Sequence, residues 1–160
     1  MSTLKAAAGR VQKTLEDRGL TCDVREFPES TRTAEEAARA IGCEVGQIAK
    51  SLIFRLPETD EAVLVVASGV NRVDETKVAR HLGHDITRAD AAFVREKTGY
   101  SIGGVPPVGH SHPPRTLLDR DLQAYVEIWA AAGTSNAVFR LTPQELATLT
   151  GAEFTEICRA

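Results

Sequence analysis

The segment from Gly103 to His110 contains the residues best suited to bind a small ligand through the backbone. It reads Gly-Gly-Val-Pro-Pro-Val-Gly-His. Two adjacent glycines allow positive φ angles and close approach of a ligand, because no Cβ intervenes. The two prolines fix the path of the chain and remove two N–H donors. A surface turn between two strands uses the same residue types, so the loop by itself is compatible with either role.

A lysine upstream supplies a second chemical group. Lys50 stands at the mouth of an apolar run, residues 51–54. Its ammonium can grip a phosphate or ribose oxygen, whereas the ordinary role of a lysine at a strand start is a solvated edge charge. The apolar neighbours on both sides predict a partly enclosed side chain.

The histidines raise the question of a metal site. His110 and His112 would place both rings on one side of an extended segment, and His81 and His84 belong to a helix end. No neighbouring carboxylate or cysteine completes a ligand set, so we predict no metal and no cofactor. His110 is predicted to be a hydrogen-bonding residue at a pocket rim.

The segment from Ser68 to Arg72 follows an apolar run directly and either lines a pocket or forms a strand-to-helix turn. The chain has no Walker loop and no G-x-G-x-x-G, G-x-S-x-G or H-E-x-x-H motif. A catalytic site would therefore consist of backbone groups, one lysine and the substrate itself.

Composition predicts one domain over residues 1–160 in the cytoplasm. The chain is 42% hydrophobic and 26% charged, and no run approaches the ~20 apolar residues of a membrane span. A net charge of −3 argues against nonspecific nucleic-acid coating, and no specific DNA binding is expected. Cys22, Cys43 and Cys158 have neither metal nor disulfide spacing, which predicts reduced, mostly buried thiols.

Apolar periodicity and capping residues predict the elements that position these groups. Helices are expected at 3–18, 33–42, 74–82, 90–98 and 142–151. Strands are expected at 21–27, 51–56, 62–67, 115–118, 125–130, 137–141 and 152–157. Helices and hairpins alternate irregularly, which favours an α+β fold, a single domain with a mixed, largely antiparallel sheet flanked by helices.

Several short motifs occur in an order that resembles the YbaK/EbsC family, free-standing relatives of the editing domain inserted in bacterial prolyl-tRNA synthetases. The likeness spans about residues 20–157. The motifs lie at 33–38, 46–54, 71–74, Lys77, 98–107, 141–143 and 149–152.

The resemblance implies a strongly curved sheet and hydrolysis of a wrong amino acid from tRNA. The family's lysine falls on Lys50, and its G-x-x-x-P loop falls on Gly103 to Pro107, so Lys50 and Gly103 are the expected catalytic residues. The expected substrate-binding residues are Gly104, Val105, Pro106, Pro107, His110, Ser68, Asn71, Asn136 and Phe27. The expected partners are aminoacyl-tRNA, bound through its 3′-terminal adenosine, and an aminoacyl-tRNA synthetase.

The chain departs from the family at Pro106, where many relatives have a small polar residue, so the loop loses an amide hydrogen and a hydroxyl. The edited amino acid, among Ala, Ser and Cys, is left open. Two alternatives also stay open: a non-catalytic module that binds nucleotides, tRNA or a synthetase, and a hydrolase of small esters or amides.

Overall fold

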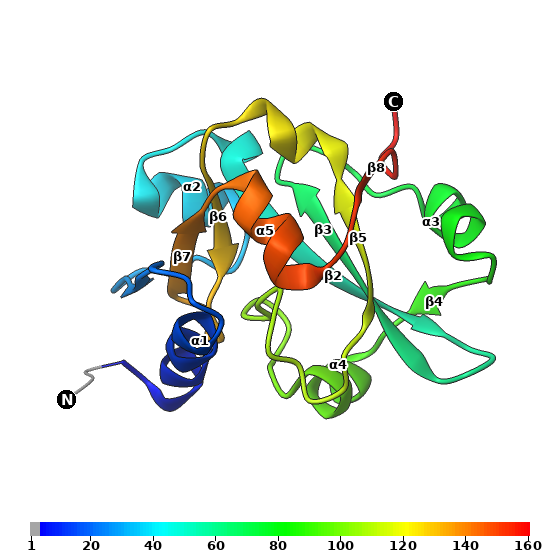
Figure 1. The fold of residues 1–160 in the computed structure, drawn as a ribbon, viewed down its shortest axis with the longest axis horizontal. Coiled ribbons are helices and arrows are strands. Elements are labelled where there is room, and N and C mark those ends of the chain that lie inside the picture. The colour runs from blue at the N-terminus through cyan, green and yellow to red at the C-terminus, as the bar shows by residue number, and fades with distance from the viewer. Residues whose placement is uncertain (1–3) are drawn as a thin grey trace.

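A single mixed sheet organises the molecule. The computed structural model describes residues 4–160 (Figure 1). The helices are α1 (Ala6–Asp17), α2 (Ala34–Ile41), α3 (Glu75–Leu82), α4 (Ala91–Thr98) and α5 (Pro143–Thr150). The strands are β1 (Val24–Glu26), β2 (Ile48–Leu56), β3 (Glu61–Ser68), β4 (Thr87–Arg88), β5 (Arg115–Asp119), β6 (Ile128–Ala131), β7 (Ala137–Leu141) and β8 (Phe154–Thr155).

The strand order is β1-β7-β6-β2-β3-β5-β8, and β4 pairs with β2. The β1–β7, β6–β7, β2–β3 and β2–β4 ladders are antiparallel, whereas β2–β6, β3–β5 and β5–β8 are parallel. The predicted α+β class with a mixed, largely antiparallel sheet is confirmed.

The strand β3 is apolar from Ala62 to Ala67 because both of its faces are covered. Leu64 and Val66 point to one cluster, whereas Val63 and Val65 point to the opposite one, as the two-residue period of a strand requires. The helix α3 contributes Val78 to the second cluster.

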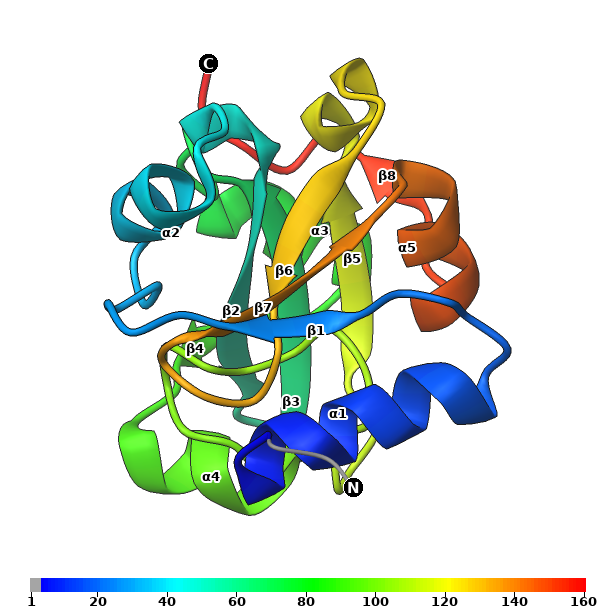
Figure 2. The same ribbon diagram turned by 90° about the vertical axis from the view of Figure 1, so that its left-hand side faces the viewer.

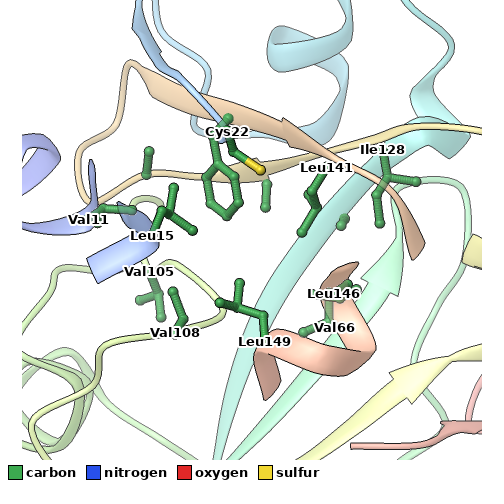
Figure 3. Close-up of a cluster of buried hydrophobic side chains, with 14 of the residues drawn as sticks. Val11, Leu15, Cys22, Val66, Val105, Val108, Ile128, Leu141, Leu146 and Leu149 are labelled. Carbon is green, nitrogen blue, oxygen red and sulfur yellow. The ribbon is translucent and has the colours of Figure 1, made fainter. Parts of the chain in front are cut away.

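The larger cluster fills the concave side of the curved sheet, which α1 and α5 close (Figures 1 and 2). Figure 3 shows Val11 and Leu15 of α1 facing Leu149 of α5 across this core. Val105 and Val108 of the glycine–proline loop lie in the same cluster, exposed by only 4% and 6%. The loop is therefore held by core packing from below.

Helix ends follow the predicted capping chemistry. The hydroxyl of Thr33 accepts from the Glu36 amide while the Glu36 carboxylate accepts from the Thr33 amide, and Thr142 and Glu145 form the same box. Gly42 ends α2 with φ +85°.

Several predicted boundaries were wrong. The strand β2 begins at Ile48 instead of Ser51, because Ile48 and Ala49 pair with β6. Residues 120–124 form a 3₁₀ helix, capped by the Asp119 carboxylate on the Asp121 amide, so β6 starts only at Ile128. The predicted strands at 21–27 and 152–157 are shorter, and β4 and a 3₁₀ turn at 45–47 were not foreseen. The first residue of the helix predicted at 3–18 lies outside the described residues.

The cysteines are free thiols, as predicted, with Cys22 and Cys158 buried and Cys43 half-buried. Burial raises the pKa of all three, and Asp119 contributes to raising that of Cys158 to about 12. Within residues 4–160, the helices are too short or too polar to cross a lipid bilayer.

Candidate active site

A cavity of about 350 Å³ opens where β2 and β6 separate. The two strands share only the pairs Ile48–Trp129 and Ala49–Ala130, and β2 then continues alone along this edge until β4 joins it at Phe54. The start of α2 and the loop residues Ile102, Gly103 and Val105 complete the walls. This volume falls in the range of small-molecule sites.

One wall is apolar, and the remaining lining carries the polar groups. Trp129, Ile48 and Val138 belong to a cluster beneath α2 and line the cavity. The ionisable side chains of the lining are Arg32, Glu35 and Lys50, and the hydroxyls are those of Thr31, Thr33 and Ser51.

The side chain of Lys50 is held from outside the cavity. Its ammonium donates a hydrogen bond of 2.7 Å to the carbonyl oxygen of Asn71. Asn71 lies in the turn after β3, which its amide closes on the Ser68 carbonyl at 3.0 Å. An ammonium has three donors, so two remain for a ligand.

The buried carboxylate of Asp119 fixes that turn. Asp119, at the end of β5, is 2% exposed. Its Oδ2 accepts from the Ser68 amide at 3.0 Å and from the Asn71 side-chain amide at 2.9 Å, and its Oδ1 accepts from the Asp121 amide at 3.0 Å. A buried carboxylate with several donors is a rigid anchor, so Asp119 positions Lys50 through Asn71.

Two unpaired amides of the loop belong to residues that line the cavity. The Gly104 amide donates to the Ser101 carbonyl at 3.0 Å, and prolines 106 and 107 have none to offer. The amides of Gly103 and Val105 have no hydrogen-bond partner within residues 4–160, and both residues line the cavity. Val105 is buried and Gly103 is half-buried. Because buried unpaired N–H groups are rare in proteins, this pair is suited to bind an oxygen atom of a ligand.

The conformation of the loop requires glycine at Gly103. Its φ is +93°, outside the range that L side chains readily adopt. The side chain of Arg32 lies against it, since an ideal Cβ on Gly103 would be 2.5 Å from Arg32 Cγ.

Residues 28–149 fit the model of the aminoacyl-tRNA editing domain. This chain belongs to that family.

Relatives of the editing domain extend over most of the chain. It is 40% identical over 124 residues to the uncharacterized protein YwhH of Bacillus subtilis (strain 168), with 78% of each chain covered. It is 30% identical over 132 residues to the "Putative Cys-tRNA(Pro)/Cys-tRNA(Cys) deacylase EbsC" of Enterococcus faecalis, covering 82% of this chain and 80% of that one. A crystal structure described as "a putative trans-editing enzyme for prolyl tRNA synthetase" shares 50% identity, with a TM-score of 0.93, 99% of this chain covered and 100% of the other. The resemblance seen in the sequence motifs is confirmed.

The structure brings together only part of the predicted site of this editing domain. Lys50, Gly103 and Val105 line the cavity. Asn71 lies behind Lys50, and the Ser68 hydroxyl donates to the Gly46 carbonyl at 2.7 Å. None of the other predicted residues lines the cavity: Gly104, Pro106, Pro107, His110, Asn136 and Phe27.

Three of these outer residues support the walls. The Asn136 side chain donates to the Phe27 carbonyl at 2.7 Å, and Phe27 packs in the cluster that contains Trp129. Gly104 accepts from the Gly133 amide at 2.8 Å, which joins the loop to the β6–β7 turn.

His110 braces the loop from behind instead of standing at the pocket rim. Its Nε2 lies 2.6 Å from the Pro106 carbonyl oxygen, and its buried Nδ1 has no partner within the described chain. The proton therefore resides on Nε2, which donates to Pro106. Burial lowers the pKa of His110 below its ordinary 6.5.

Sequence reasoning missed three residues of the editing domain: Arg32, Ser51 and Asp119. Ser51 follows Lys50 directly, yet its buried hydroxyl lines the cavity without a partner in residues 4–160. The signal for Asp119 was a carboxylate at the end of an apolar strand. Arg32 carried no local signal, because only the fold brings it to the loop.

The described residues contain no group of three or more His, Cys, Asp or Glu side chains placed to hold a metal ion.

Proposed function

We infer that this editing domain is a trans-acting aminoacyl-tRNA deacylase that removes a small wrong amino acid from tRNA, with tRNA-Pro as the expected acceptor. One observation carries the proposal. The unpaired amides of Gly103 and Val105 and the half-buried ammonium of Lys50 share one cavity. The described relatives support the tRNA assignment, since one is named for a Cys-tRNA deacylase and another for a prolyl-tRNA synthetase editing enzyme.

The proposed reaction is hydrolysis of the ester that joins the amino acid to the terminal ribose. Water attacks the carbonyl carbon, the ester C–O bond breaks, and the ribose oxygen leaves with a proton. The amides of Gly103 and Val105 stabilise the negative oxygen of the tetrahedral intermediate, as backbone N–H pairs do in oxyanion holes. Pro106 and Pro107 have no N–H group and add no donor to this pair.

Lys50 holds the terminal nucleotide and is kept away from the substrate's α-ammonium, because two like charges would repel each other. Two of its donors are free to bind ribose oxygens, and the Asn71 carbonyl fixes the direction of the third. The proposed site acts by holding the substrate and stabilising negative charge, so it needs no protein nucleophile.

The need for such an activity follows from the limits of synthetase selectivity. A difference of one methylene is worth only ~1–3 kcal/mol in an apolar pocket. A second, smaller site can accept Ala, Ser or Cys and reject proline by shape. The apolar wall formed by Trp129 and Ile48 is where we expect this selection.

We assign the domain to the whole of residues 1–160, although the family match ends at 149. The strand β8 pairs with β5. Cys158 forms an isolated antiparallel β-bridge with Val73, beside the turn that holds Lys50. The function requires a compartment that contains charged tRNA, which we take to be the cytoplasm, and a synthetase as the source of substrate.

The test is a deacylation panel. The purified protein is incubated with tRNAs charged with Ala, Ser, Cys, Thr and Pro, and loss of the ester is followed over time. Selective loss of one small amino acid, abolished in Lys50→Ala but retained in the surface control Lys13→Ala, is the expected result. Ester loss at the spontaneous rate on every member, with tRNA binding retained, would replace the proposal by the non-catalytic binding module.

A further inference from the structure

Arg32 is a second cation of the cavity that the proposed reaction does not use. It lines the cavity together with Lys50, yet it is exposed whereas Lys50 is half-buried. Arg32 stands directly before Thr33, the N-cap of α2. The cavity therefore carries one cation within its wall and one nearer the solvent.

The backbone on either side of Arg32 is fixed. The amide of Thr31, which is 6% exposed, donates to the Ser135 carbonyl at 2.8 Å. The Arg32 amide itself donates to the Ser30 hydroxyl at 3.2 Å, and Thr33 takes part in the capping box with Glu36. The side chain thus starts from a defined position.

The stem of Arg32 lies on Gly103. An ideal Cβ at Gly103 would be 2.5 Å from Cγ and 3.0 Å from both Cδ and Nε of Arg32. Glycine at this position therefore gives the arginine stem its place as well as allowing φ of +93°. The guanidinium, which begins at Nε, therefore lies at the edge of the loop.

The guanidinium has no internal partner. Within residues 4–160, Arg32 makes no ion pair, and its side chain donates no hydrogen bond. Glu35, the acidic residue of the lining, belongs to the first turn of α2 and does not pair with it. The aliphatic part of this arginine is held in place and the donors of its guanidinium are free. Such a group is well suited to bind a phosphate with two hydrogen bonds.

We propose that Arg32 binds the 5′-phosphate of the terminal adenosine, so that the cavity recognises an adenine nucleotide and not merely a nucleoside ester. This proposal rests on the proposed function, because it places the aminoacyl ester on the Gly103 and Val105 amides. The ester and the 5′-phosphate of one nucleotide lie on opposite sides of a single ribose. Lys50 then binds the ribose, and Arg32 binds the 5′-phosphate.

The decisive experiment needs no hydrolysis. Binding of adenosine 5′-monophosphate and of adenosine is measured by NMR titration for the wild type, Arg32→Met, Lys50→Met and Arg80→Met. Methionine keeps an unbranched stem on Gly103 but removes the charge. Arg80 is an exposed arginine of α3 outside this cavity and provides the matched control.

We expect the wild type to bind the monophosphate about tenfold more tightly than adenosine, the gain of one charge-assisted contact near solvent. Arg32→Met should abolish this preference and leave adenosine affinity unchanged, whereas Arg80→Met should keep it. An unchanged preference in Arg32→Met, or its loss in Lys50→Met alone, would overturn the proposal and assign the phosphate elsewhere. Equal wild-type affinity for the two ligands would also overturn it.

A kinetic arm separates this proposal from the deacylase itself. On a charged tRNA that the wild type hydrolyses, Arg32→Met should raise KM about tenfold with little change in kcat. On the same amino acid esterified to adenosine without a 5′-phosphate, the variant should match the wild type. If the wild type prefers the monophosphate but deacylates no tRNA, the Arg32 phosphate site is supported and the proposed deacylase reaction is refuted.

Discussion

The buried carboxylate of Asp119 provides the sharpest test of how the fold positions Lys50. Replacement by asparagine keeps the size of the side chain but removes its charge and turns one oxygen into a donor. The carboxylate accepts three hydrogen bonds, from the Ser68 and Asp121 amides and from the Asn71 side chain. An asparagine oxygen in the place of Oδ2 preserves the bonds from Ser68 and Asn71, whereas its NH₂ group then faces the Asp121 amide.

The magnitude follows from this geometry. Hydrogen bonds to charged groups contribute about 1.5–3 kcal/mol each and neutral ones about 0.5–1.5 kcal/mol. Two weakened bonds and one lost bond, offset in part by the relief of a buried charge, predict a loss of about 2–4 kcal/mol in the free energy of unfolding. The Asn71 turn loosens with it, so Lys50 loses its fixed direction, and a misplacement of about 1 Å in a catalytic site costs on the order of 100-fold in rate.

The matched control is Asp121→Asn. Asp121 accepts from the same Asn71 side-chain amide, at 2.8 Å, but it is exposed. Exposed charges contribute about 0–1 kcal/mol, so its replacement should leave the unfolding midpoint and the deacylation rate close to those of the wild type.

Urea denaturation and single-turnover deacylation measure the two effects. A third readout is the thiol of Cys158, whose pKa Asp119 helps to raise to about 12. Removing the negative charge should lower this pKa and speed alkylation by iodoacetamide at pH 9. If Asp119→Asn and Asp121→Asn unfold at the same urea concentration and deacylate equally fast, the positioning argument is wrong.

Three further perturbations test the loop and its surroundings. Gly103→Ala should cost about 1–2 kcal/mol of stability from the positive φ and about 100-fold in kcat/KM through displacement of the loop; activity near the wild-type level in kinetic assays would contradict this. Ser51→Ala should raise the free energy of unfolding by about 1 kcal/mol, because it removes a buried hydroxyl without a partner. It should also lower kcat/KM. A variant that is destabilised in thermal denaturation would show that the hydroxyl is hydrogen-bonded. For His110 the folded pKa lies below 6.5, so the unfolded chain binds the proton first and the wild type loses stability as pH falls below 6.5. His110→Gln should lose less between pH 7.5 and pH 5.5 in urea denaturation, and an identical loss would refute the buried neutral ring.

Local chemistry was sufficient to predict most elements. The capping boxes at Thr33 and Thr142 and the left-handed glycines that end the helices depend on neighbours within about five residues, so they can be read directly from the chain. The continuous apolar run of residues 62–67, which predicted β3, was as clear. Errors occurred where distant pairing decides the outcome: β2 extends to Ile48 because β6 lies beside it.

The candidate site shows the same division between local chemistry and distant contacts. The residue types of the glycine–proline loop and Lys50 follow from the sequence, since positive φ, missing N–H groups and a long cation are properties of single residues. Residue types alone do not say which loop amides stay unpaired. In the structure the Gly104 amide bonds Ser101, whereas the Gly103 and Val105 amides have no partner in the described chain.

Long-range partners could not be predicted at all. Asp119 lies 48 residues from Asn71, and Arg32 lies 71 residues from Gly103 along the chain. No period or spacing links such pairs, since each contact depends on how the sheet curves and where the loop is pinned by Val105 and Val108. The sequence by itself determined which groups could do the chemistry, and only the folded sheet decided which of them meet.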